Sequence, residues 1–153
     1  MNERDEYGMR LAIKAAIEAE KLDEVPIGAC LINEQGEVLA IAGNRTRTDC
    51  DPTAHAEILV LREAAQKIGN YRLTQTTLYT TIEPCAMCAG ALIQARVKRL
   101  VFGAHDIRFG AVESVFQLCD TSSLNHQIEI TKGVLAEECR ILMQDFFKAK
   151  RQK

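Results

Sequence analysis

The chain has 153 residues, of which 47% are hydrophobic and 26% charged, and its formal net charge is −2. This size and composition suit one globular domain, so we expect a single domain over residues 1–153. The net charge excludes a globally basic nucleic-acid binder. No apolar run is long enough to cross a bilayer, and the polar start MNERDEYGMR does not look like a secretory signal. We therefore expect a cytoplasmic protein with no membrane partner.

The first predicted element is a helix over about residues 6–20. Tyr7, Leu11 and Ala19 share one apolar face at helical spacing, and Asp5 stands where a helix cap is expected. Between this helix and the next lie an apolar run, a polar turn and a second apolar run, which together predict a β-hairpin. The hairpin segments are residues 27–32, 33–36 and 38–42.

The rest of the chain alternates helices and strands. A polar loop over residues 43–53 is followed by helices predicted at residues 54–68, 84–95 and 135–148, and by strands predicted at residues 78–82, 100–103 and 128–130. Gly69 is a typical helix stop, and Pro84 suits the first turn of a helix. This alternation predicts an α/β fold: a three-layer α/β/α sandwich around a mixed five-stranded sheet, closed by a basic C-terminal helix from about residue 135.

Two short segments carry the residues suited to metal chemistry, and each opens a predicted helix. Cys85 and Cys88 are three residues apart, so they share a helix face close to the positive end of the helix dipole, which favours thiolates. His55 adds an imidazole. Three protein ligands leave one tetrahedral position free, which is typical of catalytic Zn²⁺, and a water bound there has a pKa of roughly 7.

Glu57 is the predicted proton carrier beside that metal. It follows His55 by two residues, which on an ideal helix separates the side chains by about 200°. Both reach one ion only if the start of the helix points at it. Glu57 could then take a proton from water and pass it to a ring nitrogen, and later protonate a leaving amine.

Other readings of the cysteines stay open. A Cys-x-x-Cys pair alone is also found in redox sites and structural zinc sites, and Cys50 could complete such a site. A structural site leaves Glu57 without a role. The absence of a secretory signal favours reduced thiols over disulfides. His105 and His126 are expected to be surface or hydrogen-bonding histidines and not ligands.

Together the motifs read His-x-Glu followed by Pro-Cys-x-x-Cys, the signature of zinc deaminases. The similarity extends along nearly the whole chain, which resembles the bacterial tRNA-specific adenosine deaminases. The matching segments include residues 25–29, 43–45, 51–58, 70–73, 83–91, 101–104, 124–126, 133–135 and 145–147.

This resemblance implies a cytidine-deaminase-like fold, one Zn²⁺ per subunit, a homodimer, and a tRNA anticodon stem-loop as substrate. The expected reaction is hydrolysis of adenosine to inosine at the wobble position (34). The residues that the resemblance places against the target nucleoside or its RNA are Asn44, Pro26, Ile27, Ala54, Pro84, Asp106, Arg108, Phe147 and Arg151. Phe147 could stack on a base, although at least one of Phe146 and Phe147 is expected to pack in the core.

Some features depart from the family, and other functions stay open. Residues 105–110 are less basic than is usual there, and Glu113 stands where glycine is common. The main alternative is a deaminase of a free base or nucleoside, of the guanine or cytosine type, which needs no basic C-terminal run. A catalytically idle RNA-binding or scaffold subunit with structural zinc is a third possibility, and Glu57 argues against it.

Overall fold

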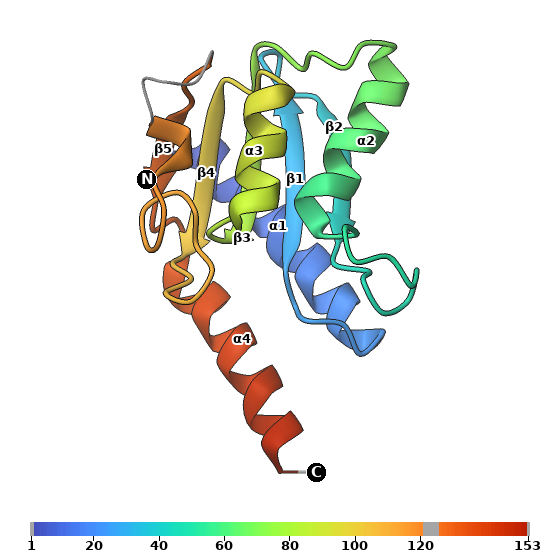
Figure 1. The fold of residues 1–153 in the computed structure, drawn as a ribbon, viewed down its shortest axis with the longest axis vertical. Coiled ribbons are helices and arrows are strands. Elements are labelled where there is room, and N and C mark those ends of the chain that lie inside the picture. Colours follow the sequence, from blue (N-terminus) through green and yellow to red (C-terminus); the bar gives the residue numbers. More distant parts are fainter. Residues whose placement is uncertain (1, 121–125, 153) are drawn as a thin grey trace.

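The computed structural model describes residues 2–120 and 126–152 and contains one mixed sheet between layers of helices (Figure 1). Its helices are α1 (Glu3–Lys21), α2 (Ala56–Ile68), α3 (Ala86–Gln94) and α4 (Ala136–Arg151), and Leu118–Asp120 forms a short 3-10 turn. Its strands are β1 (Gly28–Asn33), β2 (Val38–Gly43), β3 (Thr76–Ile82), β4 (Arg99–Ala104) and β5 (Glu129–Lys132).

The strand order in the sheet is β2-β1-β3-β4-β5. Strand β1 pairs antiparallel with β2 and with β3, whereas β3, β4 and β5 run parallel to one another. The hairpin therefore makes the sheet mixed, as predicted. The parallel strands β3 and β4 end at one edge of the sheet, and the chain segments that follow them lie together there.

Helices cover both faces of the sheet (Figure 1). One core cluster joins the inner sides of α2 and α3 to one sheet face, through residues such as Val60, Leu92 and Leu100. The other cluster joins α1 and the start of α4 to the opposite face, through residues such as Met9, Tyr79 and Cys139. The three-layer α/β/α fold is confirmed.

The cap of α1 was predicted wrongly, and its buried face was predicted only in part. Asn2 caps the helix, since its side chain accepts a hydrogen bond of 2.7 Å from the Asp5 backbone N–H. Asp5 is buried and pairs with Arg99 on β4, with oxygen–nitrogen distances of 2.6 and 2.7 Å. Ala19 is buried on the predicted face, but Tyr7 is exposed, because the side of the helix that packs on the sheet contains Met9.

The helices at the predicted metal site begin later than expected. Helix α2 starts at Ala56 and not at Ala54, and His55 is its N-cap. Cys85 is the N-cap of α3, so Pro84 precedes the cap and does not occupy the first turn. Neither residue makes a side-chain capping hydrogen bond, so both side chains can serve as metal ligands.

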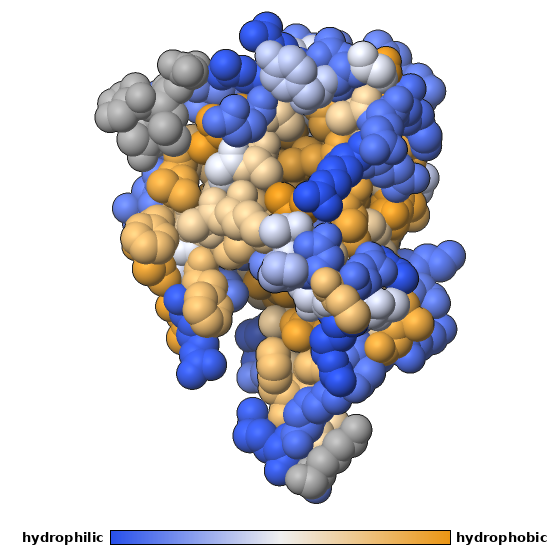
Figure 2. Space-filling model, turned by 45° about the vertical axis from the view of Figure 1, so that its right-hand side comes forward, coloured by the Kyte–Doolittle hydropathy of each residue, from blue (hydrophilic) through white to orange (hydrophobic). Residues whose placement is uncertain are grey.

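Helix α4 continues past the sheet and projects from the body of the molecule (Figures 1 and 2). Among its residues only Cys139 is buried. Phe147 is exposed and Phe146 is half-buried, so the expectation that one of them packs in the core is wrong. The last turn carries Lys148, Lys150 and Arg151, so the helix is basic at its end, as predicted.

Some predictions fall outside the described residues. They include Leu124 and Asn125, which belong to one of the matching segments, and Lys153, the last residue of the basic run Lys148, Lys150, Arg151 and Lys153. No helix within residues 2–120 and 126–152 is both long and apolar enough to span a bilayer.

Candidate metal centre and active site

Three side chains from the starts of two helices meet at one point. The Nδ1 atom of His55 lies 3.6 Å from Sγ of Cys85 and 3.5 Å from Sγ of Cys88. All three ligand atoms lie within 4.8 Å of one another. One imidazole nitrogen and two sulfurs are a donor set that zinc prefers, and three protein ligands are the number found at catalytic zinc. The residues present therefore fit a zinc ion.

The electrostatics of the three ligands favour a cation. The hydrogen bond with Cys88 and the neighbouring imidazole lower the pKa of Cys85 to about 4, while the bond to Cys85 raises the pKa of His55. The Cys85 bond and burial raise the pKa of Cys88, whose proton would leave when a metal binds. The N-terminal dipoles of α2 and α3 point at these sulfurs and stabilise negative charge.

Cys50 does not join this group, and all six cysteines, which lie within the described residues, are free thiols. Cys50 is exposed on the loop before α2, where its sulfur contacts the carbonyl oxygen of Arg47 at 3.7 Å. His105 and His126 also lie elsewhere, as predicted. His105 contacts Glu113 at 2.8 Å, and Nε2 of His126 lies 2.7 Å from the carbonyl oxygen of Val97. A four-ligand structural zinc site therefore has no support among the described residues.

Glu57 lies in the first turn of α2, beside the three ligands. Its side chain is buried, and its charge interacts with those of His55 and Cys85. Burial, reinforced by the Cys85 charge, raises the pKa of Glu57 to about 7, whereas a hydrogen bond with Thr80 lowers it. A carboxyl group that gains and loses a proton near neutral pH is suited to general acid–base catalysis.

The residues expected to wall the base pocket are brought together by backbone hydrogen bonds. The Asn44 N–H donates to the carbonyl oxygen of Ile27 at 3.0 Å, and the Arg45 N–H donates to that of Ala54 at 2.9 Å. These bonds join the end of β2 to the start of β1 and to the residue before His55. Pro26, Ala54 and Asn44 are buried, whereas Ile27 is partly exposed.

The loop after β4 carries Asp106 and Arg108. One carboxylate oxygen of Asp106 accepts hydrogen bonds from the backbone N–H groups of Arg108 and Phe109, at 3.0 and 3.1 Å. Asp106 therefore shapes its own loop, and the Arg108 side chain is left exposed. The loop also touches the metal-binding segment, because the Ala111 N–H donates to the carbonyl oxygen of Pro84 at 2.8 Å.

The end of α4 is tied to the loop between α1 and β1. The ammonium group of Lys150 bonds Asp23, and the same carboxylate accepts a bond of 2.8 Å from Arg47. Phe147 and Arg151 remain exposed on α4. These contacts join α4 to the chain on which Pro26 and Ile27 lie, but they do not connect Phe147 or Arg151 to the metal ligands.

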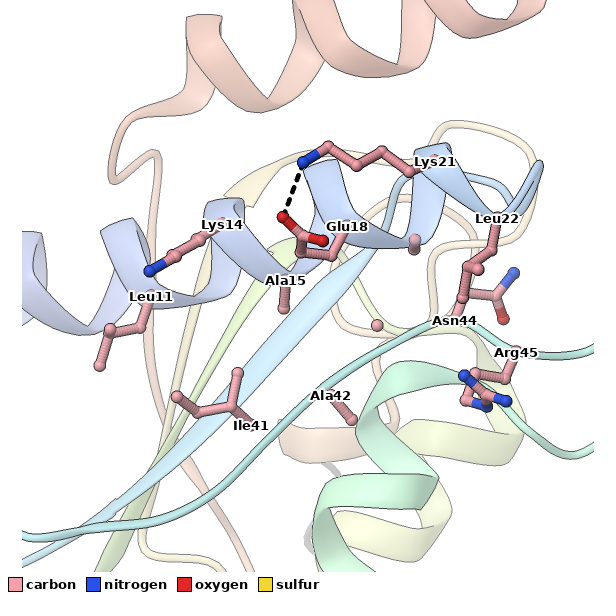
Figure 3. A pocket seen from close by; sticks show the side chains of 12 residues that line it. Leu11, Lys14, Ala15, Glu18, Lys21, Leu22, Ile41, Ala42, Asn44 and Arg45 are labelled. Atoms are coloured by element: carbon pink, nitrogen blue, oxygen red, sulfur yellow. Dashed lines mark hydrogen bonds and ion pairs between the residues drawn. The ribbon is translucent and has the colours of Figure 1, made fainter.

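A separate groove of about 470 Å³ lies between α1 and β2 (Figure 3). Leu11, Leu22 and Ile41 provide apolar lining, and the residues it shares with the expected substrate pocket are limited to Asn44. The three metal ligands and Glu57 do not line it. The groove is therefore distinct from the candidate active site.

Two buried carboxylates near the site were missed at the sequence level. Glu24 and Glu83 are buried and accept hydrogen bonds from the loops over residues 46–48 and 106–114 respectively. The available signal was weak: an acidic residue stands directly after the apolar strand β3 and directly before Pro84. A buried charge needs partners, and here the partners come from distant parts of the chain.

Comparison with known proteins identifies the class. A profile of the cytidine and deoxycytidylate deaminase zinc-binding region matches residues 2–104, which include all three candidate ligands and Glu57. The chain belongs to this deaminase family, and its cofactor is Zn²⁺.

The relatives with known names narrow the family further. The tRNA-specific adenosine deaminase of Haemophilus influenzae is 48% identical over 151 residues, which cover 99% of this chain and 87% of that protein. The protein of the same name from Bacillus subtilis is 45% identical over 150 residues, which cover 98% of this chain and 92% of that protein.

Among solved structures, too, this chain is more similar to a tRNA deaminase than to a free-base deaminase. A chain from a study of A-to-I editing by tRNA:A34 deaminases at the wobble position has a TM-score of 0.86 and 43% identity, covering 89% of this chain and 98% of that one. A guanine deaminase from Nitrosomonas europaea has a TM-score of 0.81 and 26% identity, covering 92% of this chain and 83% of that one. The fold is thus shared with free-base deaminases, but sequence similarity is higher to the tRNA enzymes.

Proposed function

We propose that this protein is a tRNA adenosine deaminase, which hydrolyses adenosine to inosine at the wobble position of an anticodon loop. The observation that carries the proposal is the group of His55, Cys85 and Cys88 beside buried Glu57, in a chain 48% identical to an enzyme of that name. The whole chain would act as one deaminase domain. In the reaction a C–O bond forms at the purine carbon, the C–N bond breaks, and ammonia leaves.

His55, Cys85 and Cys88 would hold the zinc ion, which supplies an activated water when bound. Glu57 would accept a proton from that water and donate it to a ring nitrogen of the base. Glu57 would then take the second proton from the hydroxyl group newly added to the purine carbon and deliver it to the departing amine, leaving the carbonyl of inosine. Its burial supports this role, because a carboxyl group with a pKa near 7 can both take and give a proton at neutral pH.

The target adenosine would enter a pocket walled by Pro26, Ile27, Ala54 and the backbone of Pro84. The Asn44 side chain is buried beside these residues and would hydrogen-bond the nucleoside. An unpaired loop nucleotide can be turned into such a pocket at little cost, because no base pair has to be opened.

The rest of the anticodon loop would be held by two exposed regions. Asp106 and Arg108 belong to the loop after β4, and Phe147 and Arg151 belong to α4. Arginines give phosphate contacts and an exposed phenylalanine gives a stacking surface, so these side chains suit RNA without reading its sequence.

We further propose that the active unit is a homodimer and that the protein works in the cytoplasm, where its tRNA substrates are found. The support for the dimer is the sequence resemblance. Sedimentation of the purified zinc-loaded protein tests it, and a monomer at micromolar concentration would contradict it.

The experiment that tests the function uses purified protein and an anticodon stem-loop with adenosine at the wobble position. We expect inosine at that position, measured by mass spectrometry of the digested RNA. A stem-loop with the adenosine one position away is the matched control and should stay unchanged.

The main competitor is a free-base deaminase, which the TM-score of 0.81 to a guanine deaminase favours. Guanine, cytosine and adenosine are therefore assayed beside the stem-loop by ammonia release. Turnover of a free base with no inosine in RNA would replace the proposed function.

A further inference from the structure

The side chain of Glu83 accepts several hydrogen bonds and thereby joins the segment that leads to Cys85 to the loop after β4. It is 2% exposed and lies at the end of β3, two residues before Cys85. One carboxylate oxygen accepts a bond of 3.1 Å from the backbone N–H of Asp106, and the hydroxyl of Ser114 bonds the same oxygen. Residues 106–114 therefore begin and end on this carboxylate.

The other carboxylate oxygen accepts three backbone N–H groups in succession. Val112, Glu113 and Ser114 donate at 3.1, 2.7 and 2.9 Å. Three neighbouring N–H groups that converge on one oxygen need an acceptor there, so this curled segment depends on the carboxylate supplied by Glu83.

Close packing around Glu83 supports the same reading. A Cβ atom added to Gly110 would stand 2.4 Å from the Glu83 carboxyl carbon, a distance that real Cβ atoms do not show. The backbone on either side is joined as well, since Glu83 donates its N–H to Ala104 at 2.8 Å and Ala111 donates to Pro84 at 2.8 Å. The loop is thus fitted against the segment that leads into the zinc ligands.

We propose that Glu83 is a positioning residue, which fixes the loop over residues 105–116 against the metal-binding segment so that Asp106 and Arg108 face the bound RNA. This inference rests on the proposed function. Glu83 touches neither the substrate nor the metal. It acts through the loop, which contains no regular secondary structure of its own and is joined to the metal-binding segment by the Glu83 carboxylate, by the Ala111–Pro84 backbone bond and by burial of Ala111 and Val112 in the core.

Loss of the carboxylate should weaken RNA binding more than chemistry. In Glu83→Gln the side chain keeps its size, but one of its two acceptor atoms becomes a donor that faces other donors. The loop then spends part of the time in other positions. If it is correctly placed in about a tenth of the molecules, the KM for RNA rises about tenfold.

The test measures kcat, KM and zinc content for the wild type, Glu83→Gln and Gly110→Ala on the wobble-adenosine stem-loop. A second readout is independent of activity: brief trypsin digestion of the folded protein, followed by mass spectrometry of the cut after Arg108. That bond is protected only while the loop is held. We expect both variants to show about a tenfold higher KM, a kcat within about threefold, full zinc and faster cleavage after Arg108.

Asp5→Asn is the matched control, because Asp5 is equally buried at 2% exposure but joins α1 to β4. It should lower thermal stability and leave KM and the Arg108 cut unchanged. Unchanged KM in Glu83→Gln would overturn the inference, with or without faster cleavage. Loss of zinc or a fall in kcat alone would also overturn it, because Glu83 would then serve the metal centre. Wild-type protein that forms no inosine would defeat the proposed function, and the trypsin result would still judge the positioning of the loop.

Discussion

The metal centre and the loops around it are held by different means. His55 and Cys85 cap two helices whose inner faces belong to one hydrophobic cluster, so their positions follow from the packing of regular elements. The loops over residues 44–54 and 105–116 contain no helix or strand, although Ala111 and Val112 of the second loop are buried in the same cluster. Each is curled around a buried carboxylate, Glu24 in one case and Glu83 in the other.

This difference suggests separate roles: the helix starts carry the groups for the reaction, and we propose that the loops carry those that bind the RNA. Side chains at the starts of packed helices move little, which suits metal ligands and a proton carrier that must keep fixed positions relative to one another. A loop without regular secondary structure, whose backbone N–H groups converge on one carboxylate, can change many of its other side chains while that carboxylate is kept. The two regions should therefore respond differently to substitution, and the effects should be largest at the metal centre.

The largest effect is expected for Glu57→Gln. The amide cannot carry a proton at neutral pH, so kcat on the stem-loop should fall by about 10³. Zinc content should stay at one per chain, because Glu57 is not among the three candidate ligands. Metal analysis beside the inosine assay checks both points.

His55→Ala is the matched comparison, since it removes a candidate ligand and should lose both zinc and turnover. A Glu57→Gln protein with the wild-type rate would remove Glu57 from the mechanism. A zinc-free Glu57→Gln protein would show that Glu57 helps to hold the metal and is not a proton carrier alone.

The metal centre was predictable because its signal is local. Cys85 and Cys88 are three residues apart, His55 and Glu57 are two apart, and each pair stands at the start of a helix with recognisable periodicity. The same local patterns predicted the hairpin and the layers of the fold. They placed the starts of α2, α3 and α4 one or two residues early and the start of α1 about three residues late, because the end of a helix depends on capping contacts that periodicity does not contain.

The loop anchors were not predictable, because their partners are distant in sequence. Glu83 accepts from residues 23 to 31 positions further along, and Glu24 from residues 22 to 24 positions further along. Asp5 was misread for the same reason: its partner Arg99 lies 94 positions away. From the sequence alone, such acidic residues are predicted to be helix caps or surface charges, because their hydrogen-bond partners become neighbours only in the folded chain.

Asp5→Asn tests a buried carboxylate that joins two regular elements, so its effect should be on stability and not on RNA binding. Breaking a buried ion pair should lower the free energy of unfolding by about 3 kcal/mol. Burial raises the pKa of Asp5, but the bonds from Arg99 and Tyr79 outweigh it and hold that pKa below its usual 3.8. The stabilisation is therefore fully present above pH 3.8 and is lost as the pH falls through the lowered value.

Urea unfolding at a series of pH values checks this. The stability gap between wild type and Asp5→Asn should be constant from pH 7 to about 4 and should narrow below that. Glu6→Gln, an exposed change on the same helix, is the control and should shift stability by less than about 0.5 kcal/mol. A gap that narrows already between pH 7 and 5 would contradict the lowered pKa.

Glu24→Gln should loosen the other loop with a smaller effect on activity. Glu24 accepts bonds of 2.6 Å from both the N–H and the hydroxyl of Thr48, so trypsin should cut faster after Arg47. Asn44 keeps its own backbone bond to Ile27, so KM should rise only about threefold. An unchanged rate of cleavage after Arg47 would show that this loop does not depend on its carboxylate and is therefore held differently from the loop around Glu83.

The smallest effect is expected on α4, which projects from the body and which we propose contacts RNA through single exposed side chains. Arg151→Ala should weaken stem-loop binding about twofold to fivefold at moderate salt and reduce the salt dependence of binding by about one charge, because one phosphate contact is lost. Fluorescence titration at several salt concentrations measures this. Arg72→Ala is the control, since Arg72 follows α2 at the end opposite to His55 and should leave the slope unchanged. Equal slopes for all three proteins would place the end of α4 outside the RNA interface, and recognition would then fall to the two anchored loops.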